Sequence, residues 1–135
     1  MAEKSMEERF NAVCLKLFGP EVGKSLEQWI RESRPRHFQE ITAQVMVPVW
    51  EMDKVDLRTK ILCCISLFTG LNRKEVKFFF QMAAYHGIPQ EEVEEILLLT
   101  GLEAGFPTAE NAVVLMKEAY EEQAAKSVVS KGGSK

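Results

Sequence analysis

The stretch Glu92–Met116, EVEEILLLTGLEAGFPTAENAVVLM, decides the fold expected for this chain. Its first part is typical of an apolar helix, because Ile96–Leu99 and Leu102 leave few faces free for water. Gly105 permits the positive φ that ends a helix, and Pro107 supplies a preset φ and no N–H where the next helix begins. We therefore expect a helix in the middle of the fold, a break, and a second helix.

The same helical spacing extends over the rest of the chain. Apolar side chains recur with a helical period in seven segments, and no convincing period-two alternation interrupts them. The segments cover approximately residues 5–18, 21–34, 36–47, 57–70, 72–87, 91–104 and 107–123. The sequence predicts an all-α fold of about seven helices, in a single domain over residues 1–123 with a flexible tail over residues 124–135.

Several of these helices have recognisable capping residues. Ser5 with Glu8 has the pattern of a capping box, and Asp56 is a credible N-cap for the apolar segment that follows it. Asn72 is predicted to cap the next helix, with Glu75 at its third position. Each assignment predicts a hydrogen bond from a backbone N–H group to the capping side chain.

The third helical segment contains a proline. Pro48 lacks a backbone N–H and clashes with the preceding turn, so we expect this helix to kink or end near Val47. Val49 and Trp50 would then lie on the connection. Trp50 has two open interpretations, burial in the core and a place in the wall of a substrate pocket.

Four basic residues lie at the junction of the second and third segments, namely Arg31, Arg34, Arg36 and His37. Two roles are open for this cluster. It either holds the carboxylate of a substrate or complements the negative end of a helix dipole in solvent.

The composition argues against several classes of function. The chain has 135 residues, of which 46% are hydrophobic and 27% charged, and no apolar run approaches the roughly 20 residues that span a bilayer. The N-terminal sequence MAEKSMEERF has no apolar signal region, so we expect a cytoplasmic protein that does not bind membranes. The net charge of -3, with both signs interleaved, gives no basic stripe for nucleic acid.

The residues also argue against metal and cofactor chemistry. The two histidines stand far apart, and the sequence has no HxxH, HExxH or paired CxxC motif, no Gly-rich phosphate loop and no nucleophile elbow. Cys14, Cys63 and Cys64 are expected to be buried free thiols. We therefore predict no metal and no cofactor.

Acid/base chemistry without a cofactor remains open. It needs a carboxylate in an apolar pocket, and Glu103 follows an almost wholly apolar turn beside the helix break. The alternative is an exposed acid at a helix end. His86 has two open roles, catalysis and complementing the dipole at the end of its helix. Three consecutive aromatics, Phe78–Phe80, cannot all face one core, so at least one is expected to face a pocket or another subunit.

The segments LRTKIL, EVKF, GIPQEEVEEILL and EAGFPTAENA occur in this order, after GPEVGKSLEQW and FQEITAQ in the N-terminal part. Together they resemble the carboxymuconolactone decarboxylase family, which is related to the alkylhydroperoxidase D proteins, over nearly the whole chain. The resemblance implies an all-α subunit that assembles into a trimer or hexamer with active sites near subunit contacts. It also implies loss of CO2 from an unsaturated lactone acid, without a metal, assisted by acid/base residues.

The chain departs from this family at the positions that the resemblance makes catalytic. The CxxC pair of the peroxidase-type branch would fall at Asn72–Glu75 and is absent, so thiol-based peroxide reduction is rejected. The histidine of both branches falls at Phe79, and a second histidine of the decarboxylase branch falls at Leu99. Where decarboxylase sequences often place an aromatic residue before AGFP, this chain has Glu103.

Two functions are compatible with this pattern. The first is a divergent lyase, or a related activity, acting on a small organic acid or thioester in the degradation of aromatic or alicyclic compounds. Glu103 and His86 would be its catalytic residues, and its pocket would be lined by Phe79, Leu99, Trp50, Phe106 and Lys60. The second is a catalytically silent scaffold or ligand-binding subunit of a homo-oligomer, alone or beside a paralogous subunit.

Overall fold

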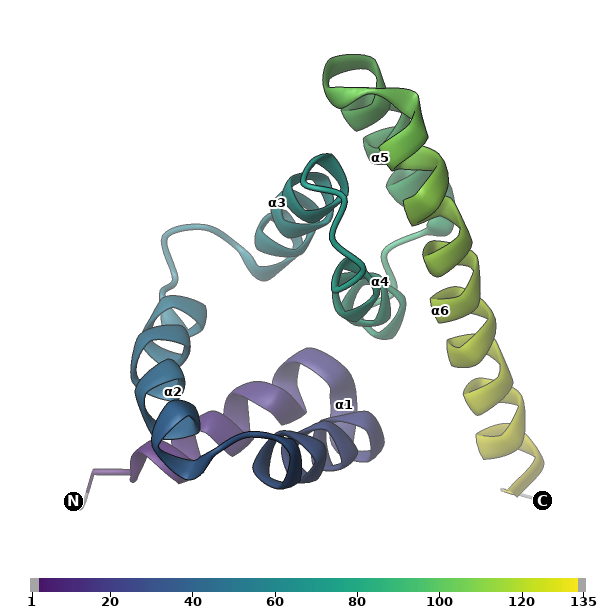
Figure 1. Ribbon diagram of the computed structural model, residues 1–135. Coiled ribbons are helices and arrows are strands. Elements are labelled where there is room, and N and C mark those ends of the chain that lie inside the picture. Colours follow the sequence, from purple (N-terminus) through teal and green to yellow (C-terminus); the bar gives the residue numbers. More distant parts are fainter. Residues whose placement is uncertain (1–2, 134–135) are drawn as a thin grey trace. The chain divides into compact units, whose positions relative to one another are not determined.

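The computed structural model describes residues 3–133, which form six helices and no strand (Figure 1). The helices are α1 (Met6–Ser33), α2 (Arg36–Glu51), α3 (Leu57–Gly70), α4 (Val76–Tyr85), α5 (Gln90–Ala104) and α6 (Phe106–Gly133). They form two compact units, with α1 and α2 in Met1–Val55 and α3 to α6 in Asp56–Lys135. The all-α class is confirmed, and the single domain over residues 1–123 stays a prediction.

α1 consists of two helical segments joined at a sharp break. Gly19 has φ 83° and ψ 171°, and Pro20 follows it. Beyond the break the chain folds back on itself. Gly23 lies so close to the preceding segment that a Cβ atom added to it would be 2.9 Å from the carbonyl oxygen of Cys14. The first two helices expected from the sequence are thus the two segments of α1, and the structure has six helices where about seven were predicted.

α2 continues through its proline. Pro48 lies inside the helix, which ends at Glu51, so an end near Val47 is wrong, while a kink there stays a prediction. Pro48 deprives the carbonyl of Gln44 of its helical donor, and because Gln44 is exposed, water can take the place of that donor. Trp50 therefore lies half-buried in the last turn of α2 rather than on a connection.

The unit of α3 to α6 has its core around α4. α4 packs against α3 and α6, and α5 packs against the same two helices. The largest fully buried side chains of this unit are Phe80, Ile61, Ile65, Leu97, Met116, Val76 and Val93. Of the three consecutive aromatics only Phe80 is fully buried. Phe78 and Phe79 are half-buried, and the ring of Phe79 stacks on Phe68 with centroids 4.8 Å apart.

α5 is less buried than its composition predicts. It buries one side against its neighbours, and its other side exposes 63% of Leu98, 56% of Leu99 and 68% of Leu102. These three leucines share one face, because residues on a helix turn by about 100° each. We call them the leucine face. The expectation that this helix lies in the middle of the fold is therefore wrong.

The helix ends agree with most of the capping residues. The Glu8 N–H donates to Ser5 Oγ at 3.1 Å, and the Thr59 N–H donates to Asp56 Oδ1 at 2.6 Å, so both N-caps are confirmed. Gly105, with φ 113°, ends α5 as expected. α6 then runs to Gly133, while residues 134–135 lie outside the described part, and the flexible tail over residues 124–135 stays a prediction.

α4 ends in a turn that α6 holds in place. Gly87 adopts φ 74°, and the Ile88 N–H donates to the carbonyl of Ala83 at 3.0 Å, a pattern that closes helix ends. The Tyr120 hydroxyl of α6 donates to the carbonyl of Ile88 at 2.6 Å. Burial raises the pKa of Tyr120 to about 12, so this hydroxyl stays a donor at neutral pH.

None of the helices in the described part combines the length and the apolar character that crossing a bilayer requires.

The three aromatics of α4 give a test of this core. Phe80→Ala should lower the free energy of unfolding by about 3–5 kcal/mol, because it leaves a cavity in a packed interior. Phe78→Ala removes the same atoms from a half-buried position and should cost clearly less. Urea denaturation of both variants measures the difference, and equal losses would contradict the assigned core.

Candidate functional site

The residues predicted to form a catalytic site come from five helices, and the site stays a prediction. Glu103 lies exposed on α5, and Leu99, one turn before it, belongs to the leucine face. Phe79 is half-buried on α4 against Phe68. Phe106 is 50% exposed at the start of α6, where its ring lies against Gly101. No described contact joins Glu103 to an acid/base partner.

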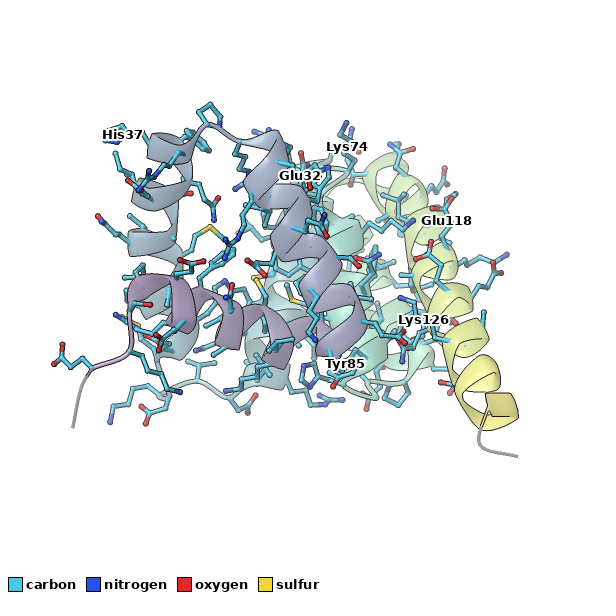
Figure 2. The ribbon with its side chains drawn as sticks, turned by 90° about the horizontal axis from the view of Figure 1, so that it is seen from below. Glu32, His37, Lys74, Tyr85, Glu118 and Lys126 are labelled. Atoms are coloured by element: carbon cyan, nitrogen blue, oxygen red, sulfur yellow. The ribbon has the colours of Figure 1, made fainter. Side chains whose placement is uncertain are left out.

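The two predicted basic partners, His86 and Lys60, belong to different elements of the fold. His86 caps the C-terminal end of α4, exposed, with its ring edge against Tyr85 at a centroid distance of 5.1 Å. Figure 2 shows Tyr85 well apart from Lys74, which precedes α4, so His86, next to Tyr85, lies at the far end of α4 from that turn. Lys60 is half-buried on α3, and Trp50 belongs to the other unit of the chain.

The turn between α3 and α4 differs from the sequence-based expectation and forms a different site. Asn72 was predicted to cap α4, but it adopts φ 55° and ends α3. Its N–H donates to the carbonyl of Thr69, and the Arg73 N–H donates to the carbonyl of Phe68, both at 2.9 Å. These two bonds define a Schellman motif with asparagine in the left-handed position. α4 then begins at Val76, after Glu75.

The Asn72 side chain is tied to α6. Its Oδ1 accepts a hydrogen bond from Asn111 Nδ2 at 3.1 Å. Near the start of α6, the Thr108 hydroxyl donates to the carbonyl of Gly105 at 2.8 Å. The turn after α3 and the first turns of α6 are therefore held beside each other by polar side chains.

A cavity of about 230 Å³ lies between these two segments. Its polar lining consists of Thr69, Asn72, Thr108 and Asn111, with the cations Arg73 and Lys74 on the turn. Its apolar lining consists of Phe68, Val76, Ala112 and Leu115. We call this cavity the turn cavity. Residues of α3, α4 and α6 contribute to its lining, and every lining residue belongs to one compact unit.

Thr69 is the unusual group in the turn cavity. The residue is 1% exposed, and its hydroxyl has no hydrogen-bond partner among the described residues. A buried hydroxyl without a hydrogen-bond partner lowers the free energy of unfolding by about 1–3 kcal/mol, so such groups are rare in native protein cores. Thr100, the other buried threonine, donates to the carbonyl of Ile96 at 2.8 Å and pairs with the Ser66 hydroxyl at 2.8 Å.

The chemistry of the turn cavity favours binding over catalysis. Two cations, two carboxamides and two hydroxyls present donors for a small anion. Its described lining includes no aspartate, glutamate, histidine or cysteine, so it holds no group that titrates near neutrality. The arrangement can hold a carboxylate and orient it, but it does not supply a general base.

The cysteines are not the three buried thiols that the sequence predicted. Cys14 is buried, and desolvation, followed by the charge of Glu27, raises the pKa of its thiol to about 11. Cys63 is exposed and Cys64 half-buried, because α3 turns one side away from its neighbours. Within the described residues, no group of three or more His, Cys, Asp or Glu side chains is arranged to hold a metal ion.

The turn cavity was missed because its signal is weak in sequence. Its polar residues come from positions 69, 72, 108 and 111, on helices that periodicity alone does not pair. Asn72 carried one usable clue, because asparagine serves both as an N-cap and in the left-handed position after a helix. The second possibility is the one realised.

Comparison of the chain with models of protein families, with curated proteins and with solved structures found no match.

The two buried threonines give a matched test of the site. Thr69→Val should raise the free energy of unfolding by about 1 kcal/mol, since it replaces an unpaired hydroxyl by a methyl group of similar size. Thr100→Val should lower it by about 1–3 kcal/mol, because it leaves Ser66 without its partner. Chemical denaturation without added ligand measures both. A loss of stability in Thr69→Val equal to that in Thr100→Val would mean that Thr69 is paired after all.

Proposed function

We propose that this chain is an all-α ligand-binding subunit that holds a small organic acid in the turn cavity. The observation that carries the proposal is the buried hydroxyl of Thr69, which has no described partner and lines a cavity with two cations on its turn. A ligand oxygen that reaches this hydroxyl would satisfy it. Such a ligand therefore stabilises the folded chain twice, through a hydrogen bond to Thr69 and through charge.

The size and charge of the turn cavity define the ligand class. Small-molecule pockets commonly measure about 300–1,000 Å³, so a volume of about 230 Å³ suits an acid of only a few carbon atoms. The guanidinium of Arg73 is planar and can hold both oxygens of a carboxylate, while Lys74 adds a point charge. The apolar side chains of Phe68 and Leu115 suit the carbon skeleton.

The resemblance to the carboxymuconolactone decarboxylase family supports the same location. In its peroxidase-type branch the reactive CxxC pair would fall at Asn72–Glu75, which is the turn that borders the cavity. This chain has an amide, two cations and an acid at these four positions. We propose that the chain is a divergent member in which a ligand-binding turn stands where relatives place reactive thiols.

Self-association is the second part of the proposal. The leucine face presents three large apolar side chains, each more than half exposed, and such patches on a protein surface commonly mark contacts with other proteins. The resemblance implies a homo-oligomer, a trimer or a hexamer, and a second copy or a paralogous subunit would cover this face.

Catalysis at Glu103 is the other candidate function. Glu103 lies one turn after Leu99 and is exposed, so a subunit seated on the leucine face would also enclose this carboxylate. An enclosed carboxylate can act as a general acid or base on an organic acid or thioester. The lyase activity is thus proposed for the assembled oligomer, without a cofactor.

The binding proposal is tested with small carboxylates such as acetate, lactate and malonate. The double variant Arg73→Gln/Lys74→Gln should lower the affinity for the best of them by about tenfold or more, because charge-assisted hydrogen bonds contribute about 1.5–3 kcal/mol. The control is Lys117→Gln/Lys126→Gln, which removes equal charge from exposed positions outside the cavity lining. Isothermal titration calorimetry measures both. Equal loss of affinity in the control would show that the net charge of the protein, and not contact with Arg73 and Lys74, determines carboxylate binding.

The catalytic candidate is tested separately. Glu103→Gln keeps the size of the side chain and removes its charge, so it should abolish lyase turnover and leave the sedimentation coefficient and carboxylate binding unchanged. Turnover is followed as CO2 release from lactone acids. Full activity in Glu103→Gln would remove Glu103 from the mechanism and leave the binding proposal intact.

A further inference from the structure

A second cavity lies in the other unit of the chain, where α1 and α2 meet. Its volume is about 640 Å³, and all of its described lining residues belong to α1 and α2. The lining residues are Met6, Glu7, Phe10, Arg31, Arg34, Arg36, Gln39, Glu40, Ala43 and Gln44. We call this the arginine cavity. The break at Gly19 creates it by folding the end of α1 back toward the start of the same helix.

Two of its three arginines are neutralised by carboxylates. Arg31 forms ion pairs with Glu7 and with Glu27, so the two ends of α1 are joined by charge. Arg36 pairs with Glu40 one turn later at 2.8 Å. These two guanidinium groups are matched within the chain and leave little attraction for a further anion.

Arg34 is different from its neighbours. It is half-buried at the C-cap of α1, and no carboxylate of the described residues lies within ion-pair distance of it. Its guanidinium lies 5.9 Å from the centre of the Phe38 ring. Arg34 is therefore the one arginine of the described cavity lining without a carboxylate partner of its own, whereas Arg31 has two. His37, the fourth member of the basic cluster, points outward from the start of α2 in Figure 2.

Gln39 adds a second polar group to the wall. Its Oε1 is buried and has no hydrogen-bond partner among the described residues. Rotation of the carboxamide by 180° exchanges this oxygen for Nε2, which is a donor. Gln39 and Arg34 both line the arginine cavity, and neither the Gln39 Oε1 nor the Arg34 guanidinium has a polar partner among the described residues.

The rest of the lining selects the kind of acid. Met6, Phe10 and Ala43 supply an apolar surface, and the volume falls in the range of about 300–1,000 Å³ that is typical of small-molecule pockets. One guanidinium without a carboxylate partner can pair with one carboxylate. Glu7 and Glu40 in the same wall disfavour a dianion such as phosphate or a dicarboxylate.

We propose that the arginine cavity binds a monocarboxylate with an apolar body, as a medium-chain fatty acid has. The carboxylate pairs with Arg34 and Gln39, and the hydrocarbon chain lies on Met6, Phe10 and Ala43. This site is separate from the turn cavity in residues, volume and ligand class, so it does not depend on the function proposed for that cavity.

The test uses the full chain and decanoate, with decylammonium and inorganic phosphate as the comparison ligands. Decanoate should bind in isothermal titration calorimetry. Arg34→Gln should lower its affinity by about tenfold or more, because the variant loses a charge-assisted hydrogen bond. Gln39→Leu should weaken it less. Lys24→Gln removes the same charge from an exposed position outside the cavity and should leave the affinity unchanged.

Several outcomes would overturn the proposal. Decylammonium binding as tightly as decanoate would show a purely apolar association, for example with the leucine face. Phosphate binding as tightly as decanoate would show that Arg34 attracts any anion and does not select a monocarboxylate with an apolar body. Equal affinities of the wild-type chain, Arg34→Gln and Gln39→Leu, all with unchanged helical circular dichroism, would place decanoate elsewhere on the protein.

Discussion

The left-handed conformation of Asn72 is the constraint on which the turn cavity of the α3–α6 unit depends. Non-glycine residues avoid this conformation at a cost of about 1–2 kcal/mol, and here two Schellman hydrogen bonds and the bond from Asn111 offset that cost. The conformation ends α3, turns the chain toward α4 and places Arg73 and Lys74 beside Thr69. A helix continuing past Leu71 would abolish the turn, the cation pair and the cavity together.

Periodicity predicted the helical class, because residues such as Ile61, Ile65 and Leu97 recur on the faces that are buried. Local capping chemistry predicted the ends at Ser5 and Asp56. It failed where one residue type serves two roles, as at Asn72, and the helix end expected near Val47 is absent because α2 continues through Pro48 to Glu51. The leucine face and the turn cavity could not be predicted, because both depend on which helices pack together, and composition does not carry that information.

Two features of the α3–α6 unit distinguish it from a fully packed helical core: an unpaired buried hydroxyl and an exposed apolar helix face. Thr100 is fully paired inside the core, whereas Thr69 is buried and unpaired beside a cavity, which is why Thr69 rather than Glu103 marks the candidate binding site. α5 leaves its leucine face exposed, which suits a subunit that associates. The resemblance would place thiols and histidines where this chain has none, which is compatible with the proposed roles in binding and assembly. Catalysis at Glu103 is proposed only for an assembled oligomer.

The most direct test of the central claim is to locate a bound acid on the full chain by nuclear magnetic resonance. Backbone amide shifts of ¹⁵N-labelled protein would be followed while lactate is added, with the measurement repeated on Thr69→Val. Our account predicts saturable shifts concentrated at Thr69, Asn72, Arg73 and Asn111, and their loss in the variant. Shifts spread over the surface, or the same shifts in Thr69→Val, would contradict the claim that the turn cavity is a binding site.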